Sequence, residues 1–229
     1  MTAAGGDRGN FSLRGSVLVG EELVTRSATV VVEKGKIAAI EDERPRTEDC
    51  WICPAFFNAH VHLGDTVAMD LPAAGDLESL VTPPDGLKHR ILRATPRRTL
   101  VDGMIASIST MIAGGVAGFA DFREGGVDGV RALLEASSGN ACHAVIFGRE
   151  GGEYIADGIG ISSVRDVPSI DEKVAGARAA GKLIAFHAGE KNAGDVLQGI
   201  SSHRPIPAMN HPYLSAGVLI FPWLFLPAE

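Results

Sequence analysis

The hydrophobic pattern of the chain changes its period near residue 50. Before that point, three short runs rich in β-branched residues lie at 16–19, 28–32 and 36–40. Such runs are typical of strands. Lys34-Gly35 separates the last two runs and is typical of a hairpin turn, because glycine readily adopts a positive φ. The first region therefore predicts a small β-rich unit.

Beyond residue 50 the chain alternates apolar runs of strand length with longer stretches of helical period. Strands are expected at 52–57, 116–122, 142–147, 158–164 and 183–186, and helices at 97–113, 126–136 and 169–180. Ser169 stands three residues before Glu172, a capping-box spacing that predicts the start of the last helix. Alternating strands and helices of this length predict a parallel sheet with helices outside it.

The connection at 64–96 is long and rich in proline, with a Pro84-Asp85-Gly86 turn. A connection of this length is unusual unless it covers a site. It contains a basic cluster, Lys88-His89-Arg90, which fits a solvated helix face; contact with a substrate is the alternative.

Composition narrows the classes of function. The net charge of −7 argues against binding a nucleic-acid backbone. Cys50 and Cys53 form a C-x-x-C pair without a second pair, so free thiols in a reducing cytoplasm are expected, with a redox pair as the alternative. The N-terminus has no apolar signal segment, and the apolar run at 216–226 is too short to span a membrane. The expected location is cytoplasmic, without nucleic-acid or membrane partners.

Two histidines end the apolar run that begins near Ile52. His60 and His62 are separated by one residue, so on a strand they point to the same face. Neutral imidazole nitrogen is a good ligand for zinc and related divalent ions. The pair therefore indicates a metal site, with two solvated or core histidines as the alternative.

The stretch Pro54-Ala55-Phe56-Phe57-Asn58-Ala59-His60-Val61-His62 resembles the first barrel strand of the amidohydrolase superfamily, in its cytosine deaminase and chlorohydrolase branch. The family usually has Pro-Gly where this chain has Pro54-Ala55. The resemblance implies an α/β fold: a partial (β/α)8 TIM-type barrel of about five β/α units beside a small N-terminal β-sandwich portion. The expected division is a sandwich portion at 1–50, a barrel at 51–200 and an irregular apolar tail at 201–229.

The same resemblance implies the chemistry of the site. His187 matches the third metal histidine of the family, and Glu190 matches the glutamate that shuttles protons. The strand at 158–164 lacks the lysine that bridges two metals in binuclear members, which favours one divalent ion: zinc, with iron or manganese as alternatives. The implied activity is hydrolysis of a C–N bond in a small-molecule substrate by a metal-activated water. Hydrolysis of an ester or a chlorinated ring uses the same residues.

Three expected strands are followed by an arginine and an acidic residue. Arg123, Arg149 and Arg165 would all lie at the rim where barrels keep their chemistry. One interpretation is that an arginine binds an anionic group of the substrate through two parallel hydrogen bonds. The other is that each arginine forms an ion pair with its neighbour, Glu124, Glu150 or Asp166.

The pattern weakens after Glu190. His211 lies at the distance expected for a sixth-strand histidine that contacts substrate, and no counterpart of the eighth-strand aspartate is found. We therefore expect a chain truncated at its C-terminus that is slow or inactive as given, or a non-catalytic remnant that acts only by association. Unpaired apolar strand edges would make it a homo-oligomer or prone to aggregation.

Overall fold

The computed structural model describes residues 9–44, 50–72, 74–163, 169–188 and 218–222. Its contacts divide the chain into two compact units, with the boundary in sequence between Ala55 and Phe56. The functional residues considered below all belong to the second unit.

The first unit is a four-stranded sheet of order β3-β2-β1-β4. Its strands are β1 (Phe11–Val19), β2 (Val24–Glu33), β3 (Lys36–Asp42) and β4 (Trp51–Ile52). β2 is antiparallel to both β1 and β3, whereas β4 is parallel to β1. Lys34 and Gly35 turn the β2–β3 hairpin with φ angles of 52° and 74°, as the sequence predicted.

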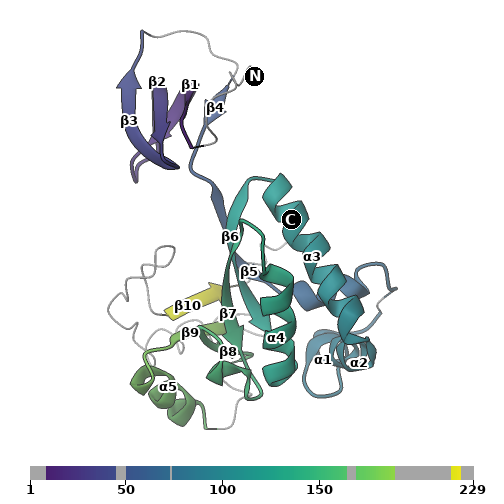
Figure 1. Ribbon diagram of the computed structural model, residues 1–229. Coiled ribbons are helices and arrows are strands. Elements are labelled where there is room, and N and C mark those ends of the chain that lie inside the picture. Colours follow the sequence, from purple (N-terminus) through teal and green to yellow (C-terminus); the bar gives the residue numbers. More distant parts are fainter. Residues whose placement is uncertain (1–8, 45–49, 73, 164–168, 189–217, 223–229) are drawn as a thin grey trace, which may run out of the picture. The chain divides into compact units, whose positions relative to one another are not determined.

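The second unit is built on a parallel sheet of order β10-β9-β8-β7-β6-β5 (Figure 1). Its strands are β5 (Phe56–Val61), β6 (Val116–Arg123), β7 (His143–Gly148), β8 (Gly158–Ile161), β9 (Leu183–Ala188) and β10 (Val218–Pro222). The sheet curls as the wall of a TIM-type barrel does, so the partial barrel and the separate N-terminal sheet expected from the sequence are confirmed.

Alternate residues of the central strands pack on opposite faces of this sheet. One face holds Ala120 and Phe122 of β6 with Val145 and Phe147 of β7. The other face carries Phe119 and Ile146 with other buried side chains, against α3 (Arg97–Ala113) and α4 (Gly126–Ser137). α5 (Ile170–Ala179) covers β8 and β9 in the same way. The first face is the interior of the barrel wall, and the helices lie outside it.

The long connection after β5 is not a bare loop. It contains the 3-10 helix η1 (Leu63–Ala68), α1 (Leu77–Val81) and α2 (Leu87–Ala94). η1 packs against α3, and α2 packs against η1. This arrangement brings a charged residue of α2, Lys88, back to the end of β5.

Two local expectations differ from the structure. Ser169 has φ 56° and its side chain makes no capping hydrogen bond, so the predicted capping box is wrong although the helix forms. Backbone in the left-handed region does not place the hydroxyl over the first free N–H groups. In addition, the segment 201–229, expected to be irregular, contributes β10, which pairs in parallel with β9 through partners such as Ile220 and Phe186.

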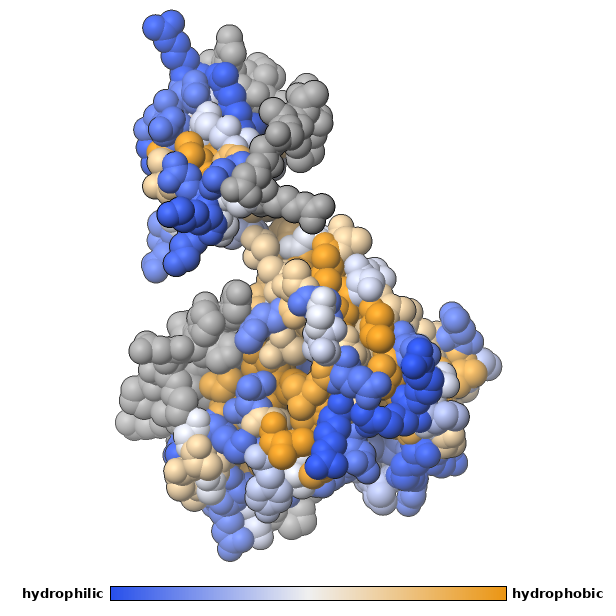
Figure 2. Space-filling model, viewed as in Figure 1, coloured by the Kyte–Doolittle hydropathy of each residue, from blue (hydrophilic) through white to orange (hydrophobic). Residues whose placement is uncertain are grey.

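The surface of the second unit exposes apolar side chains on α3, where Ile105 and Ile112 are 43% and 38% exposed, and Figure 2 shows hydrophobic residues along this helix. Scattered exposed apolar residues are ordinary on soluble surfaces. Of the helices in the described part of the chain, none has the length and apolar character required to cross a membrane.

Candidate metal centre

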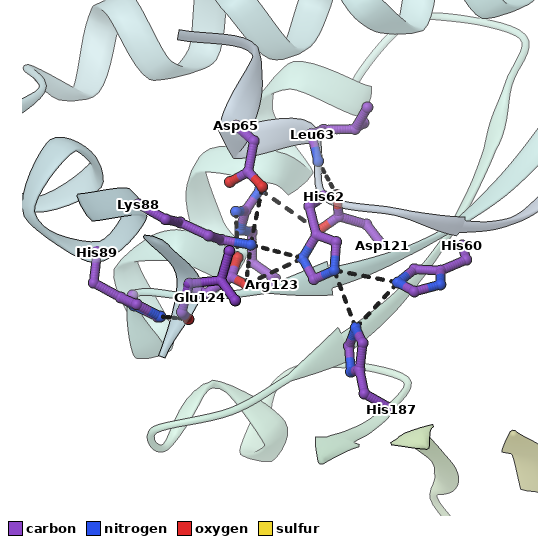
Figure 3. A network of polar contacts seen from close by, with 12 residues as sticks. His60, His62, Leu63, Asp65, Lys88, His89, Asp121, Arg123, Glu124 and His187 are labelled. Atoms are coloured by element: carbon purple, nitrogen blue, oxygen red, sulfur yellow. Dashed lines mark hydrogen bonds and ion pairs between the residues drawn. The ribbon is translucent and has the colours of Figure 1, made fainter. Parts of the chain in front are cut away.

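Three histidines from the region of strands β5 and β9 meet at one point (Figure 3). The Nε2 atoms of His60 and His62 are 3.2 Å apart, and each lies 3.1 Å from Nε2 of His187. His60 lies near the end of β5 and His62 directly follows this strand, whereas His187 lies near the end of β9. Two ring nitrogens bound to one tetrahedral ion at about 2.0–2.1 Å would be roughly 3.3–3.4 Å apart. The three nitrogens therefore have the spacing of ligands to a single ion.

The neighbours of two histidines fix which ring nitrogen carries the proton. Nδ1 of His187 lies 3.3 Å from the carbonyl oxygen of Ile161 and donates to it. Nδ1 of His62 lies 3.1 Å from Oε1 of Glu124 and donates to that carboxylate. Both bonds leave Nε2 with its lone pair, which is the form that binds a metal.

Electrostatics also keep the rings of His60 and His187 neutral. Burial is the main cause that lowers the pKa of His60 to about 4, and the neighbouring His62 and the charge of Lys88 add to it. Burial and the neighbouring His62 and Arg149 lower the pKa of His187 to about 2. Neutral imidazole at pH 7 is the ligand form of histidine. The donor set thus fits a divalent ion that accepts nitrogen ligands.

Phe122 packs beneath the three rings. Its ring centroid lies 4.8 Å from that of His60, 5.6 Å from that of His62 and 4.3 Å from that of His187. The side chain is fully buried. An apolar floor of this kind holds the imidazoles in place and removes water from one side of the site.

Glu124 connects the histidines to a buried charge network (Figure 3). Its Oε1 lies 2.8 Å from Nζ of Lys88, and its Oε2 lies 2.8 Å from Nη2 of Arg123. Burial alone would raise the pKa of Glu124, but the hydrogen bond from His62 and the charges of Lys88 and Arg123 outweigh it and hold the pKa well below its usual range. Glu124 is therefore an anion at neutral pH.

Lys88 lies within 3.0 Å of both Oδ2 of Asp65 and Nδ1 of His62. A single Nδ1 atom cannot donate to Glu124 and accept from Lys88 in the same tautomer. The two carboxylates are the stronger acceptors for the ammonium group because both bonds are charge-assisted. We therefore assign the lysine to Glu124 and Asp65, and the Nδ1 proton of His62 to Glu124.

Arg123 is enclosed by partners. Its guanidinium, only 3% exposed, lies 3.5 Å from Oδ1 of Asp121 and 3.5 Å from the sulfur of Met104. Asp121 in turn accepts a 2.6 Å hydrogen bond from the N–H of Leu63. This chain of contacts ties the end of β6 to the residue that follows His62. Arg123 therefore supports the site from the outer face of the sheet.

A large cavity lies beside the histidines rather than among them. It measures about 780 Å³ and is lined by α2, α3 and α4 together with Arg123 and Glu124. The chemistry points to the histidine cluster, because that is where three metal-ligating atoms converge.

The structure brings together only some of the residues expected to form the site. His60, His62 and His187 converge as expected. Arg149 lies close enough to His60 and His187 for its charge to lower their pKa values. Arg123 pairs with Glu124, which matches the ion-pair interpretation rather than contact with a substrate. Glu190, Arg165 and His211 lie outside the described residues.

Two residues of the site were not singled out for it from the sequence. Glu124 was considered only as an ion-pair partner of Arg123, and Lys88 only as part of a basic cluster. The sequence signal that could have found Glu124 is its place directly after a buried strand next to the histidine strand. Lys88 is 26 residues from His62 and has no comparable signal.

Comparison with known proteins agrees with this geometry. The sequence model of the amidohydrolase family matches residues 51–150, which include the H-x-H pair and Glu124. Residues 51–150 of this chain therefore carry the sequence pattern of the amidohydrolase family.

Two archaeal relatives, each named "Putative aminohydrolase", resemble this chain in sequence. The protein of Methanothermobacter thermautotrophicus is 41% identical over 142 residues, which are 59% of this chain and 37% of the relative. The protein of Archaeoglobus fulgidus is 35% identical over 191 residues, which are 79% of this chain and 53% of the relative. The chain thus spans about half or less of the relatives it matches.

Solved structures share the fold. Atrazine chlorohydrolase of Arthrobacter aurescens TC1, complexed with zinc, matches with a TM-score of 0.56 at 15% identity over 84% of this chain and 56% of that one. 5-Methylcytosine deaminase of Klebsiella pneumoniae, liganded with 5-fluorocytosine, matches with a TM-score of 0.54 at 16% identity over 76% of this chain and 50% of that one. At these identities the likeness shows the architecture only.

Proposed function

We propose that this chain forms the metal-binding part of a hydrolase that cleaves a C–N bond in a small molecule, as in the deamination of an amino-substituted nitrogen heterocycle. The observation that carries the proposal is the triangle of Nε2 atoms from His60, His62 and His187, 3.1–3.2 Å apart. The deaminase among the structural neighbours supports the substrate class.

His60, His62 and His187 would hold one divalent ion, for which zinc fits the all-nitrogen donor set. Bound zinc lowers the pKa of water to near neutrality and so supplies a nucleophile at pH 7. The protein must then keep the imidazoles neutral and hold them in the orientation that ligation needs. Burial keeps His60 and His187 neutral, whereas the carbonyl of Ile161 orients the ring of His187 and the carboxylate of Glu124 orients the ring of His62.

Proton transfer to the leaving nitrogen requires a group with an accessible proton. We assign this role to Glu190, which follows β9 three residues after His187. Glu124 is unsuited to it, because hydrogen bonds and ion pairs already occupy both of its oxygens and its pKa is held low. Glu124 is therefore a positioning residue for His62.

The test begins with metal content. The purified whole chain should bind about one zinc ion per molecule, and a His60→Ala, His62→Ala double variant should lose it. Release of ammonia from cytosine, from aminotriazines and from amino heterocycles that carry a carboxylate or a phosphate then tests the reaction. Equal zinc content in the two proteins would refute the metal site, and zinc binding without ammonia release from any of these compounds would refute the substrate class.

A second reaction uses the same residues. The solved chlorohydrolase supports hydrolysis of a chlorinated ring, with chloride in place of the leaving nitrogen. Release of chloride from atrazine without release of ammonia from amino compounds would favour this alternative. A chain that binds no zinc and releases neither product would favour a non-catalytic role.

A further inference from the structure

The two arginines that follow β6 and β7 have the same local sequence but different surroundings. Residues 123–126 and 149–152 both read R-E-G-G. From the sequence alone, both arginines are equal candidates for binding an anionic group of a substrate. The register of the two strands separates them.

β6 and β7 pair with Phe122 opposite Phe147 and Arg123 opposite Gly148. The two R-E-G-G motifs are therefore offset by one residue, so that Glu124, not Arg123, falls level with Arg149. A shift of one residue reverses the face to which a side chain points. Phe122 and Phe147 face the barrel interior. By alternation Arg123 points outward and Arg149 points inward, on the side of the histidines.

The contacts of each arginine agree with this assignment. Arg123 is held by Asp121, Glu124 and Met104 on the outer face. Arg149, in contrast, has two buried nitrogens, Nε and Nη2, that find no hydrogen-bond partner among the described residues. The polar contacts of the nearby Glu124 are with His62, Lys88 and Arg123, not with these two nitrogens.

Nε and Nη2 are the two nitrogens of one edge of the guanidinium, and their N–H bonds point in the same direction. This edge forms the two parallel hydrogen bonds with which arginine binds a carboxylate or a phosphate. A buried donor left without a partner costs free energy. The charge of Arg149 also reaches the metal-ligating rings, since it contributes to lowering the pKa of both His60 and His187.

We propose that Arg149 is a specificity-determining residue that binds an anionic oxygen group, a carboxylate or phosphate, on the substrate through its Nε–Nη2 edge. This inference rests on the proposed function, because it places the anionic group within reach of the carbon that is hydrolysed at the histidine cluster. It narrows the substrate class to amino compounds that carry an acidic group.

Binding of simple anions tests the inference without any turnover. The probes are acetate, inorganic phosphate and the neutral analogue acetamide, added to the ¹⁵N-labelled whole chain. The Arg149 Nε–H signal is assigned by its loss in Arg149→Lys. We expect it to move and saturate with acetate or phosphate and to stay fixed with acetamide. The anion that saturates at the lower concentration identifies the carboxylate or the phosphate as the preferred group.

Two variants make the test specific. Arg149→Lys keeps the positive charge but loses the pair of parallel N–H donors. It should weaken anion binding, measured by calorimetry, by about tenfold or more. Arg98→Lys, an exposed arginine of α3 paired with Asp102, should bind the anions as the parent does. Near-ultraviolet circular dichroism checks that both variants are folded. If Arg149→Lys does not fold, the titration of the wild-type chain with the three probes still tests the inference.

The outcomes separate this inference from the proposed function. An Arg149 signal that neither anion moves, or equal anion affinity in parent and Arg149→Lys, overturns the role of Arg149 even if zinc binding and ammonia release are observed. Saturable anion binding at Arg149 in a chain that releases no ammonia supports the anion site and counts against the deaminase activity alone.

Discussion

Glu124 accepts a 3.1 Å hydrogen bond from Nδ1 of His62, and this contact links the end of β6 to the histidine that directly follows β5. Carboxylate–histidine contacts of this kind turn the ring and raise its basicity as a ligand. The contact is also the route by which Lys88 and Arg123 act on the site, because both form ion pairs with Glu124.

Replacing Glu124 with Gln should weaken zinc binding by about 10- to 100-fold, the usual effect of losing an outer partner of a metal-bound histidine. Competition with a chromophoric chelator measures the affinity. Glu135→Gln, on the exposed face of α4, is the matched control and should leave the affinity unchanged. Equal affinity in Glu124→Gln and the parent would show that this carboxylate does not orient His62.

The stability of the metal-free protein should fall as the pH is lowered below about 6.5. The pKa of His187 is lowered from 6.5 to about 2 in the folded chain. Below pH 6.5 the unfolded state therefore binds a proton that the folded state does not. The contribution of His187 to the free energy of unfolding is fully present above pH 6.5. Below that pH it decreases by up to about 1.4 kcal/mol per pH unit. His60, with its pKa lowered to about 4, adds to the effect.

Urea unfolding at several pH values between 6.5 and 4.5 measures this dependence. His187→Gln removes the titrating group and should reduce the slope by about 1 kcal/mol per pH unit. His143→Gln, at the exposed start of β7, is the control and should keep the slope of the parent. Identical slopes in His187→Gln and the parent would contradict the assigned burial of a neutral His187.

Replacing Arg123 with Met should destabilise the second unit by about 3–5 kcal/mol, because it leaves the buried carboxylate of Asp121 without its counter-charge and removes one of the two cations that pair with Glu124. Thermal or urea unfolding gives the change in free energy. Arg98→Met breaks an exposed pair with Asp102 instead, and should change stability by less than about 1 kcal/mol. Similar losses in the two variants would mean that the network around Arg123 is not a buried ion-pair system.

The sequence by itself predicted the strands β5 to β9 with the helices α3, α4 and α5 and the pair of His60 and His62. Helix 97–113 forms as expected because its apolar residues recur at helical spacing, and the strands form where apolar runs are short. His60 and His62 lie on one strand, so their spacing alone places both rings on one face. His187 joined them only through the resemblance to a known family, since nothing local relates residues 127 positions apart.

Only the tertiary structure decided what the charged residues do. The two R-E-G-G motifs are identical in sequence, yet Arg123 is enclosed in ion pairs and Arg149 keeps an unpartnered edge among the described residues. The physical reason is the pairing of Phe122 with Phe147, which sets the motifs one residue apart and turns the two arginines to opposite faces of the sheet. Register between strands is a property of their packing, and neither strand contains it alone.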